Sequence, residues 1–283
     1  NYTMLCFDCP RACGVDREKS LGYCKEGKDI KVAKIIPNFK WEEPCISGQN
    51  GALAIFFSGC NLRCSFCQNY DISHISKGTQ YSPKEFRKLL ESYDLTKFSS
   101  IDLITPTHFS SALIESLQNF KCPIPIVWNS SGYESKEMIK KVAKIVDVFM
   151  PDFKYFSSQI SQELSACPNY FEVAIEAIKE MKKQKSNNIY ENDILKEGVI
   201  IRHLVLPGHT SDSIKIMDAI KENIDNPLIS LMSQFIPLYN SPIKRKLYPL
   251  EYKIVLNHAL KIGLNKGFIQ DYSSADENFV PDF

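Results

Sequence analysis

Several features that would point to a membrane or to nucleic acid are missing from this sequence. No run of about 18 apolar residues occurs, so the sequence predicts no transmembrane helix and no membrane partner. The net charge is only +1, because 34 Lys and Arg residues nearly balance 33 Asp and Glu residues, and this argues against a nucleic-acid partner. Residues 1–30 are charged and cysteine-rich, unlike a secretion signal. These absences predict a globular, cytoplasmic chain.

Disulfides are also not expected, although the chain has ten cysteines. Disulfide frameworks are typical of small secreted domains, whereas this chain has 283 residues, groups most of its cysteines and shows no secretion signal. Metal ligation in a reducing compartment is therefore the better interpretation of the clusters. Cys122 and Cys167 lie apart from them and are predicted to be buried or idle thiols.

Cys60, Cys64 and Cys67 form a Cys-x3-Cys-x2-Cys motif directly after a short apolar run. A cubane iron–sulfur cluster binds one thiolate at each of its four irons, so three protein thiolates leave one iron open for chemistry. A zinc site and buried free thiols are the alternatives. Zinc usually takes four ligands, however, and residues 68–100 contain no cysteine. The spacing therefore favours a [4Fe-4S] cluster with an open iron.

A second group of cysteines precedes this motif on a short segment that contains Gly and Pro. Its members are Cys6, Cys9, Cys13 and Cys24. Such a segment has no core of its own, so a bound metal is expected to hold it. Zinc and an auxiliary iron–sulfur cluster both fit four thiolates, and a structural role is preferred to electron relay. Cys45 either replaces one ligand or is simply buried.

Apolar strand-like runs alternate with helical patterns over most of the chain. The predicted strands are 51–58, 100–105, 124–129, 146–151, 198–206 and 228–236, and the predicted helices are 82–93, 110–119, 135–144, 169–184, 210–224 and 249–261. Strands separated by helices indicate parallel pairing through right-handed crossovers. The pattern predicts an α/β fold, a partial (β/α)6 TIM-like barrel over 49–283, preceded by a Cys-rich metal-binding extension over 1–48. Residues 185–197 are predicted to form a polar surface excursion.

The loop around the three cysteines resembles the radical S-adenosylmethionine (SAM) superfamily, in which an aromatic residue, here Phe66, directly precedes the third cysteine. In that superfamily the open iron chelates the amino and carboxylate groups of SAM. The reduced cluster then cleaves SAM to methionine and a 5′-deoxyadenosyl radical, which abstracts hydrogen from a substrate. The resemblance therefore implies SAM as a cofactor, an oxidoreductase activity and the same partial barrel.

Longer motifs resemble an uncharacterised radical SAM group that is similar to pyruvate formate-lyase-activating enzymes. These motifs are residues 6–17, 21–24, 41–48, 105–108 and 202–208. The resemblance implies a protein or peptide substrate, as in glycyl-radical activation, and a flavodoxin or ferredoxin-type reductant is expected. Radical modification of a small molecule and a non-catalytic iron–sulfur electron-transfer module are the alternatives.

Ligands of such barrels lie at the carboxyl ends of the strands, which makes polar residues there candidate SAM contacts. Activating enzymes carry Gly-Gly-Glu after the second strand, where this chain has Thr-Pro-Thr-His; Thr105 or Thr107 is expected to accept the SAM amino group instead. His108 is either a ligand contact or a histidine satisfied at a helix start. Phe66 either stacks on adenine or packs only against the protein.

Three later strands supply the remaining candidates. Asn129 and Ser131 resemble residues that meet the ribose or methionine part of SAM, although a plain turn is the alternative. Asp152 and Lys154 resemble an Asp-Leu-Lys motif whose lysine lies near the SAM carboxylate; the alternative is a surface ion pair. Arg202 interrupts an apolar strand and therefore needs a protein partner or a ligand.

Overall fold

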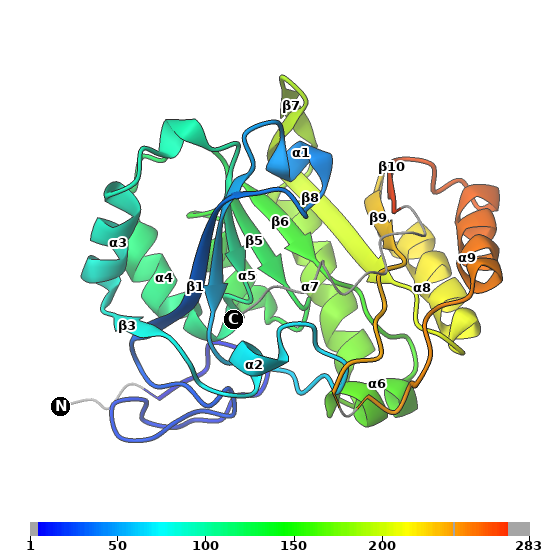
Figure 1. Ribbon diagram of the computed structural model, residues 1–283, viewed down its shortest axis with the longest axis horizontal. Coiled ribbons are helices and arrows are strands. Elements are labelled where there is room, and N and C mark those ends of the chain that lie inside the picture. Colours follow the sequence, from blue (N-terminus) through cyan, green and yellow to red (C-terminus); the bar gives the residue numbers. More distant parts are fainter. Residues whose placement is uncertain (1–4, 240, 271–283) are drawn as a thin grey trace.

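A twisted, open, mostly parallel sheet forms the centre of the computed structural model, which describes residues 5–239 and 241–270 (Figure 1). Its strands are β1 (Ile30–Phe39), β2 (Ala52–Phe57), β3 (Thr79–Tyr81), β4 (Ile101–Ile104), β5 (Ile126–Ser130), β6 (Val148–Pro151), β7 (Ile189–Glu191), β8 (Ile194–Leu204), β9 (Leu228–Met232) and β10 (Gly267–Ile269). Their order is β10-β9-β8-β6-β5-β4-β2-β1-β3, with β7 beside β8. The strands from β2 to β10 along this order pair in parallel, which confirms the predicted partial barrel.

The helices connect these strands and cover the outer side of the sheet (Figure 1). They are α1 (Pro44–Ser47), α2 (Tyr70–Ser73), α3 (Pro83–Glu91), α4 (Ser110–Leu117), α5 (Lys136–Val142), α6 (Ser158–Ser165), α7 (Tyr170–Gln184), α8 (Thr210–Asn223) and α9 (Pro249–Lys261). Each predicted helix is present. The start of α3 has a capping box, since Ser82 Oγ accepts from Glu85 N while Ser82 N donates to Glu85 Oε2. No helix in the described ranges is long and apolar enough to cross a bilayer.

Strand β1 was not expected, because it falls within the predicted Cys-rich extension and its burial alternates only weakly. It pairs antiparallel with β2, Phe39 lying opposite Ala52 and Val32 opposite Phe57. The helix α6 also escaped prediction, since only Ile160 and Leu164 give it an apolar stripe. The segment 185–197 forms an exposed hairpin of β7 and the start of β8. The division at residue 48 stays a prediction.

The short helix α1 closes one end of the barrel. Cys45 and Ile46 of α1 are 3% and 0% exposed, and they pack against inward-facing residues of the sheet that include Val127, Met150 and Ile200. Cys45 is therefore buried among apolar side chains. In Figure 1, α1 lies at one end of the strands, whereas α2, which follows the cysteine loop, lies at the other. One end is thus plugged and the other carries the cysteines.

Candidate functional site

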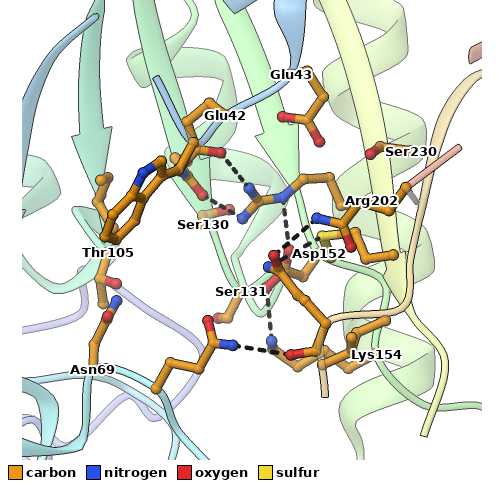
Figure 2. A pocket seen from close by; sticks show the side chains of 18 of the residues that line it. Glu42, Glu43, Asn69, Thr105, Ser130, Ser131, Asp152, Lys154, Arg202 and Ser230 are labelled. Carbon is orange, nitrogen blue, oxygen red and sulfur yellow. Dashed lines mark hydrogen bonds and ion pairs between the residues drawn. The ribbon is translucent and has the colours of Figure 1, made fainter. Parts of the chain in front are cut away.

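A cavity of about 610 Å³ lies inside the barrel, between the cysteine loop and the segment that leads from β1 into α1. Its lining includes Cys60, Cys64 and Cys67 at one end and Glu42 and Glu43 at the other. Polar residues from the intervening strand ends complete the wall (Figure 2). The cavity therefore joins the predicted cluster site to most of the predicted SAM contacts.

The cysteine loop takes its shape from close contacts with two distant segments. Gly59 has φ +75°, and a Cβ there would lie 2.5 Å from Cys24 O, so only glycine permits this approach. On the other side, Ser65 N donates to Leu164 O at 2.9 Å at the end of α6. Arg11 also holds the loop, since its Nε donates to Asn61 O at 2.8 Å. The N-terminal segment and α6 together fix the loop before any ligand binds.

Each of the three sulfurs accepts at least one hydrogen bond. Leu62 N lies 3.3 Å from Cys60 Sγ, Ser165 Oγ lies 2.9 Å from Cys64 Sγ, and Ser73 Oγ lies 3.3 Å from Cys67 Sγ. Burial raises the pKa of Cys60 to about 12 and that of Cys67 to about 11. Thiolates at such positions need a cation to balance them, and the irons of a cluster supply it.

The three sulfurs fit a cubane. Among the described residues, the N-terminal cysteines included, no three His, Cys, Asp or Glu side chains are placed to hold one metal ion. In a cubane each iron takes its own thiolate, so the sulfurs need not converge on one point. Three sulfurs, one buried and two half-buried, on a preformed loop with an adjoining cavity match such a cluster.

We expect the Ser165→Ala variant to lower the midpoint reduction potential of the bound cluster. Hydrogen bonds to cluster sulfurs stabilise the more negative, reduced state, and the mutation removes the donor to Cys64. A redox titration followed by electron paramagnetic resonance measures the change. Ser161→Ala is the matched control, because Ser161 lies in the same helix and its Oγ donates to Ser158 O. A midpoint that stays at the wild-type value would contradict this role.

Arg202 is held in the cavity wall by three partners from different parts of the chain (Figure 2). Its Nε donates to Asp152 Oδ1 at 3.0 Å and its Nη1 to Glu42 Oε2 at 2.8 Å. Its Nη2 donates to Asn129 Oδ1 at 2.7 Å. Arg202 therefore has the protein partners that a buried guanidinium requires.

Lys154 extends this network toward the cysteine loop. Its Nζ lies 2.7 Å from Asp152 Oδ2, and the two side chains are 19% and 17% exposed, so the pair lies in the cavity wall rather than on the surface. Burial works to raise the pKa of Asp152, but Lys154 and Arg202 hold it below its ordinary value. Asp152 is therefore ionised, and both cations face a permanent negative charge.

The remaining carboxyl groups of the network bind protons more readily. Burial outweighs the nearby Arg202 charge and raises the pKa of Glu42 to about 7. Burial also raises the pKa of Asp102, which is fully buried on β4 and accepts from Asn129 Nδ2 at 3.2 Å. Glu42 can thus take up a proton near neutral pH, whereas Asp152 stays charged.

Four other predicted contacts also line the cavity. They are Phe66, Thr105, Asn129 and Ser131. Thr105 has φ +61°, a left-handed conformation that costs energy for a β-branched residue and that proteins tolerate mainly at functional sites. Phe66 is 7% exposed and its ring centroid lies 5.5 Å from that of Phe235, which is compatible with packing and with stacking on a ligand.

Of the two threonines predicted as alternatives, Thr105 lines the cavity and Thr107 does not, and His108, predicted as a ligand contact or as a histidine at a helix start, also lies outside the lining. Thr107 Oγ1 donates to the buried Glu134 at 2.7 Å, and His108 Nε2 contacts Ser58 O at 2.6 Å. Burial lowers the pKa of His108 to about 3, so its ring is neutral. The turn of 3-10 helix over Thr107–Phe109 points both side chains into the protein rather than toward the cavity.

The structure also gathers the thiols of the N-terminal cysteine group. Arg17 reaches two of them, with its Nη1 4.0 Å from Cys6 Sγ and its Nη2 3.9 Å from Cys24 Sγ. A Cβ added to Gly22 would lie 3.2 Å from Cys24 Sγ and 3.5 Å from Cys13 Sγ. Burial raises the pKa of Cys9 to about 12, and the other three thiols raise it further.

Several residues of the site were not among the predicted ones. They are Glu42, Glu43, Asp102, Ser73 and Ser165. Asp102 had the same signal as Arg202, a charged residue within an apolar strand, and that signal would have found it. Ser165 carries no sequence signal, because it reaches Cys64 from 101 residues away in the chain. Ser73 follows Cys67 by six residues, and no motif of the sequence marks it.

Comparisons with known proteins agree with this geometry. The sequence profile of the Radical SAM superfamily matches residues 54–220. An uncharacterised protein of Methanocaldococcus jannaschii is 33% identical over 260 residues, covering 88% of this chain and 70% of the relative.

Two solved structures share the fold. SuiB of Streptococcus suis, solved with SAM, superposes with a TM-score of 0.53 at 15% identity over 77% of this chain, which spans only 50% of SuiB. A radical SAM methyltransferase from Sphaerobacter thermophilus gives a TM-score of 0.56 at 11% identity over 77% of this chain and 66% of that one. The profile match covers more than half of the sequence and contains all three cysteines of the cavity; the chain belongs to the Radical SAM superfamily.

Proposed function

We propose that this protein is a radical SAM enzyme that abstracts a hydrogen atom from a substrate bound in the barrel cavity. The superfamily implies a [4Fe-4S] cluster and SAM as cofactors. When bound, they supply a 5′-deoxyadenosyl radical. The single observation that carries the proposal is that three hydrogen-bonded cysteines open onto the same cavity as the polar strand ends.

In this proposal, different residues of the cavity bind different groups of the cluster and of SAM. Cys60, Cys64 and Cys67 would hold the cluster. Lys154 can pair with the SAM carboxylate, while its ion pair with Asp152 orients it. Thr105 stands where activating enzymes place an acidic contact, and its hydroxyl can accept from the SAM amino group.

Other groups of the cavity meet the rest of SAM and keep water out. Asn129 and Ser131 offer amide and hydroxyl groups to the ribose. The plug formed by α1 closes the far end of the barrel to solvent, which protects a reactive intermediate.

For the substrate, we propose a protein or peptide group, as in glycyl-radical activation, with flavodoxin or ferredoxin as the reductant. Radical modification of a small molecule is the alternative within the same chemistry. A non-catalytic electron-transfer module is the alternative outside it. The cavity favours an enzyme over such a module, because electron transfer alone does not need about 610 Å³ of lined space beside the cluster.

Anaerobic reconstitution tests the proposed function. The protein should bind a [4Fe-4S] cluster whose spectrum changes when SAM is added, and it should release 5′-deoxyadenosine after reduction by dithionite. A reconstituted protein whose spectrum ignores SAM and that releases no 5′-deoxyadenosine would defeat the proposal. Reduction by flavodoxin in place of dithionite tests the physiological donor.

We also propose a second metal site at Cys6, Cys9, Cys13 and Cys24. The Cys9→Ala variant should lose iron or zinc beyond the irons of the SAM cluster, and metal analysis per chain distinguishes the two metals. It should also retain the SAM cluster less firmly, because the backbone of Cys24 contacts Gly59 beside the cysteine loop. Cys122→Ala is the control outside both groups, and equal metal contents in all three proteins would exclude the site.

A further inference from the structure

Glu43 is a buried carboxylate without a hydrogen-bond partner in the cavity wall. It is 8% exposed, and its Oε2 contacts no donor among the residues that the structure describes. It lines the same cavity as the three cysteines, and Figure 2 shows it above Arg202 with no dashed contact. A buried carboxylate without a hydrogen-bond donor destabilises a protein. The presence of Glu43 here therefore points to a ligand that donates the missing hydrogen bond.

The local fold does not need this side chain. Glu43 is the N-cap of α1, but its backbone carbonyl closes the first turn by accepting from Ile46 N at 2.8 Å and Ser47 N at 3.0 Å. Its side chain makes no capping bond. The nearest cation of the network, Arg202, already donates to Glu42, Asp152 and Asn129.

Glu43 lies at the opposite end of the barrel from the cysteine loop. It follows β1, whose last residue, Phe39, pairs with Ala52 at the start of β2, whereas the cysteines follow Phe57 at the end of β2. These six residues of β2 span about 16–20 Å at about 3.3 Å per residue. SAM bound to such a cluster would keep its ammonium group at the cysteine end. An ammonium or guanidinium group that meets Glu43 would therefore belong to a second ligand.

The charges around the cavity show which kind of group this is. Apart from the cysteines, seven ionisable side chains line or adjoin it: Glu42, Glu43, Asp102 and Asp152 against Lys40, Lys154 and Arg202. Lys154 and Arg202 already have carboxylate partners, Lys40 is exposed, and no cation among the described residues forms an ion pair with Glu43. We propose that Glu43 binds a guanidinium or ammonium group of the substrate at the plugged end of the cavity. This inference rests on the proposed function and adds to it a substrate class.

Two kinds of substrate carry such a cationic group. A small amine or guanidine and the basic side chain of a peptide both present a cation on an aliphatic stem. Such a stem suits the apolar lining residues Pro44, next to Glu43, and Phe268, which packs against the apolar cluster around α1, and the cation then forms a charge-assisted hydrogen bond with Glu43.

Binding of matched probes to the reconstituted protein with SAM tests this role. Butylguanidinium is compared with its uncharged counterpart butylurea, and the peptide Gly-Arg-Gly with Gly-citrulline-Gly. Ligands that bind the native state raise the melting temperature, so thermal unfolding at graded probe concentrations gives the affinity. We expect a cationic probe of one pair to bind the wild type and its neutral counterpart to bind much more weakly. A response to butylguanidinium would identify a small-molecule substrate, and a response to Gly-Arg-Gly would identify a peptide.

The Glu43→Gln variant isolates the carboxylate. It keeps the size of the side chain and removes its charge, so its affinity for the cationic probe should fall about tenfold or more. Glu163→Gln, at an exposed position of α6, should bind as the wild type does. Equal affinity of Glu43→Gln and wild type, or no response of the wild type to either cationic probe, would overturn the inference.

A second measurement separates this inference from the proposed function. Without substrate, the dithionite-reduced wild type should release 5′-deoxyadenosine whether or not it binds a cationic probe. Absence of this release would refute the proposed function. Release by a wild type that binds neither cationic probe would refute the inference alone, since the probe titrations do not depend on turnover.

Discussion

The Cys64→Ala variant is expected to abolish 5′-deoxyadenosine release altogether. Cys64 supplies one of only three thiolates, is 9% exposed and is fixed by Ser165 Oγ at 2.9 Å, so no other side chain can take its place. A cubane that loses one of its ligands leaves two irons without protein thiolates and is retained poorly. The same loss is expected for Cys60→Ala and Cys67→Ala.

Three measurements on Cys64→Ala check this result. Iron content and the low-temperature paramagnetic resonance spectrum report the cluster, and chromatography of the reaction mixture reports 5′-deoxyadenosine. Cys167→Ala is a demanding control, because Cys167 is also fully buried near the loop but lies outside the cavity lining. Release of 5′-deoxyadenosine by Cys64→Ala at the wild-type level would refute the assignment of the site.

The Arg202→Met variant is expected to lower the free energy of unfolding by about 3–5 kcal/mol, which is typical when one partner of a buried ion pair is removed. The Arg202 side chain is 13% exposed, and its removal leaves Glu42 and Asp152 without their guanidinium partner. Chemical denaturation of the reconstituted protein measures the change. Lys140→Met, which breaks an exposed pair with Glu137, is the control and should change little.

The loss in Arg202→Met should also depend on pH. Without Arg202, burial raises the folded-state pKa of Glu42 further above its unfolded value. A carboxyl group with a raised folded pKa binds its proton more tightly in the native state, so stability falls as the pH rises from the unfolded pKa to the folded one. The deficit relative to wild type should therefore be larger at pH 8 than at pH 5. A loss below about 1 kcal/mol at both pH values would show that Arg202 does not hold the network together.

The order of strands and helices was largely predictable, because it depends on patterns within short segments. The capping box of α3 and the apolar runs of β2 and β4 to β6 are local signals, and all of these elements formed within a few residues of the expected bounds. Strand β1 and helix α6 were not predictable in this way. The apolar residues of β1 are interrupted by Lys31, Lys34 and Pro37, and α6 has only two large apolar residues. Strand β1 is stabilised by pairing with β2, and α6 contacts the cysteine loop through Leu164 and Ser165.

The candidate site was likewise predictable in part. The three cysteines were identified from their spacing, since cluster ligands on one loop are necessarily close in sequence. The requirement for a partner at Arg202 was also identified, but the partner itself was not. Glu42 lies 160 residues away in the chain, and Ser165 lies 101 residues from Cys64.

The sequence by itself determined the cluster motif, the alternating α/β architecture and the resemblance to the superfamily. Each of these depends on the order and spacing of residues that are close together in the chain. Only the tertiary structure decided which carboxylates meet Arg202, which hydroxyls reach the sulfurs and which end of the barrel is closed. It turned Thr107 and His108 away from the cavity and brought Glu42 and Glu43 into it. Residue spacing shows which face of a strand a side chain lies on, whereas its partner depends on how distant segments pack.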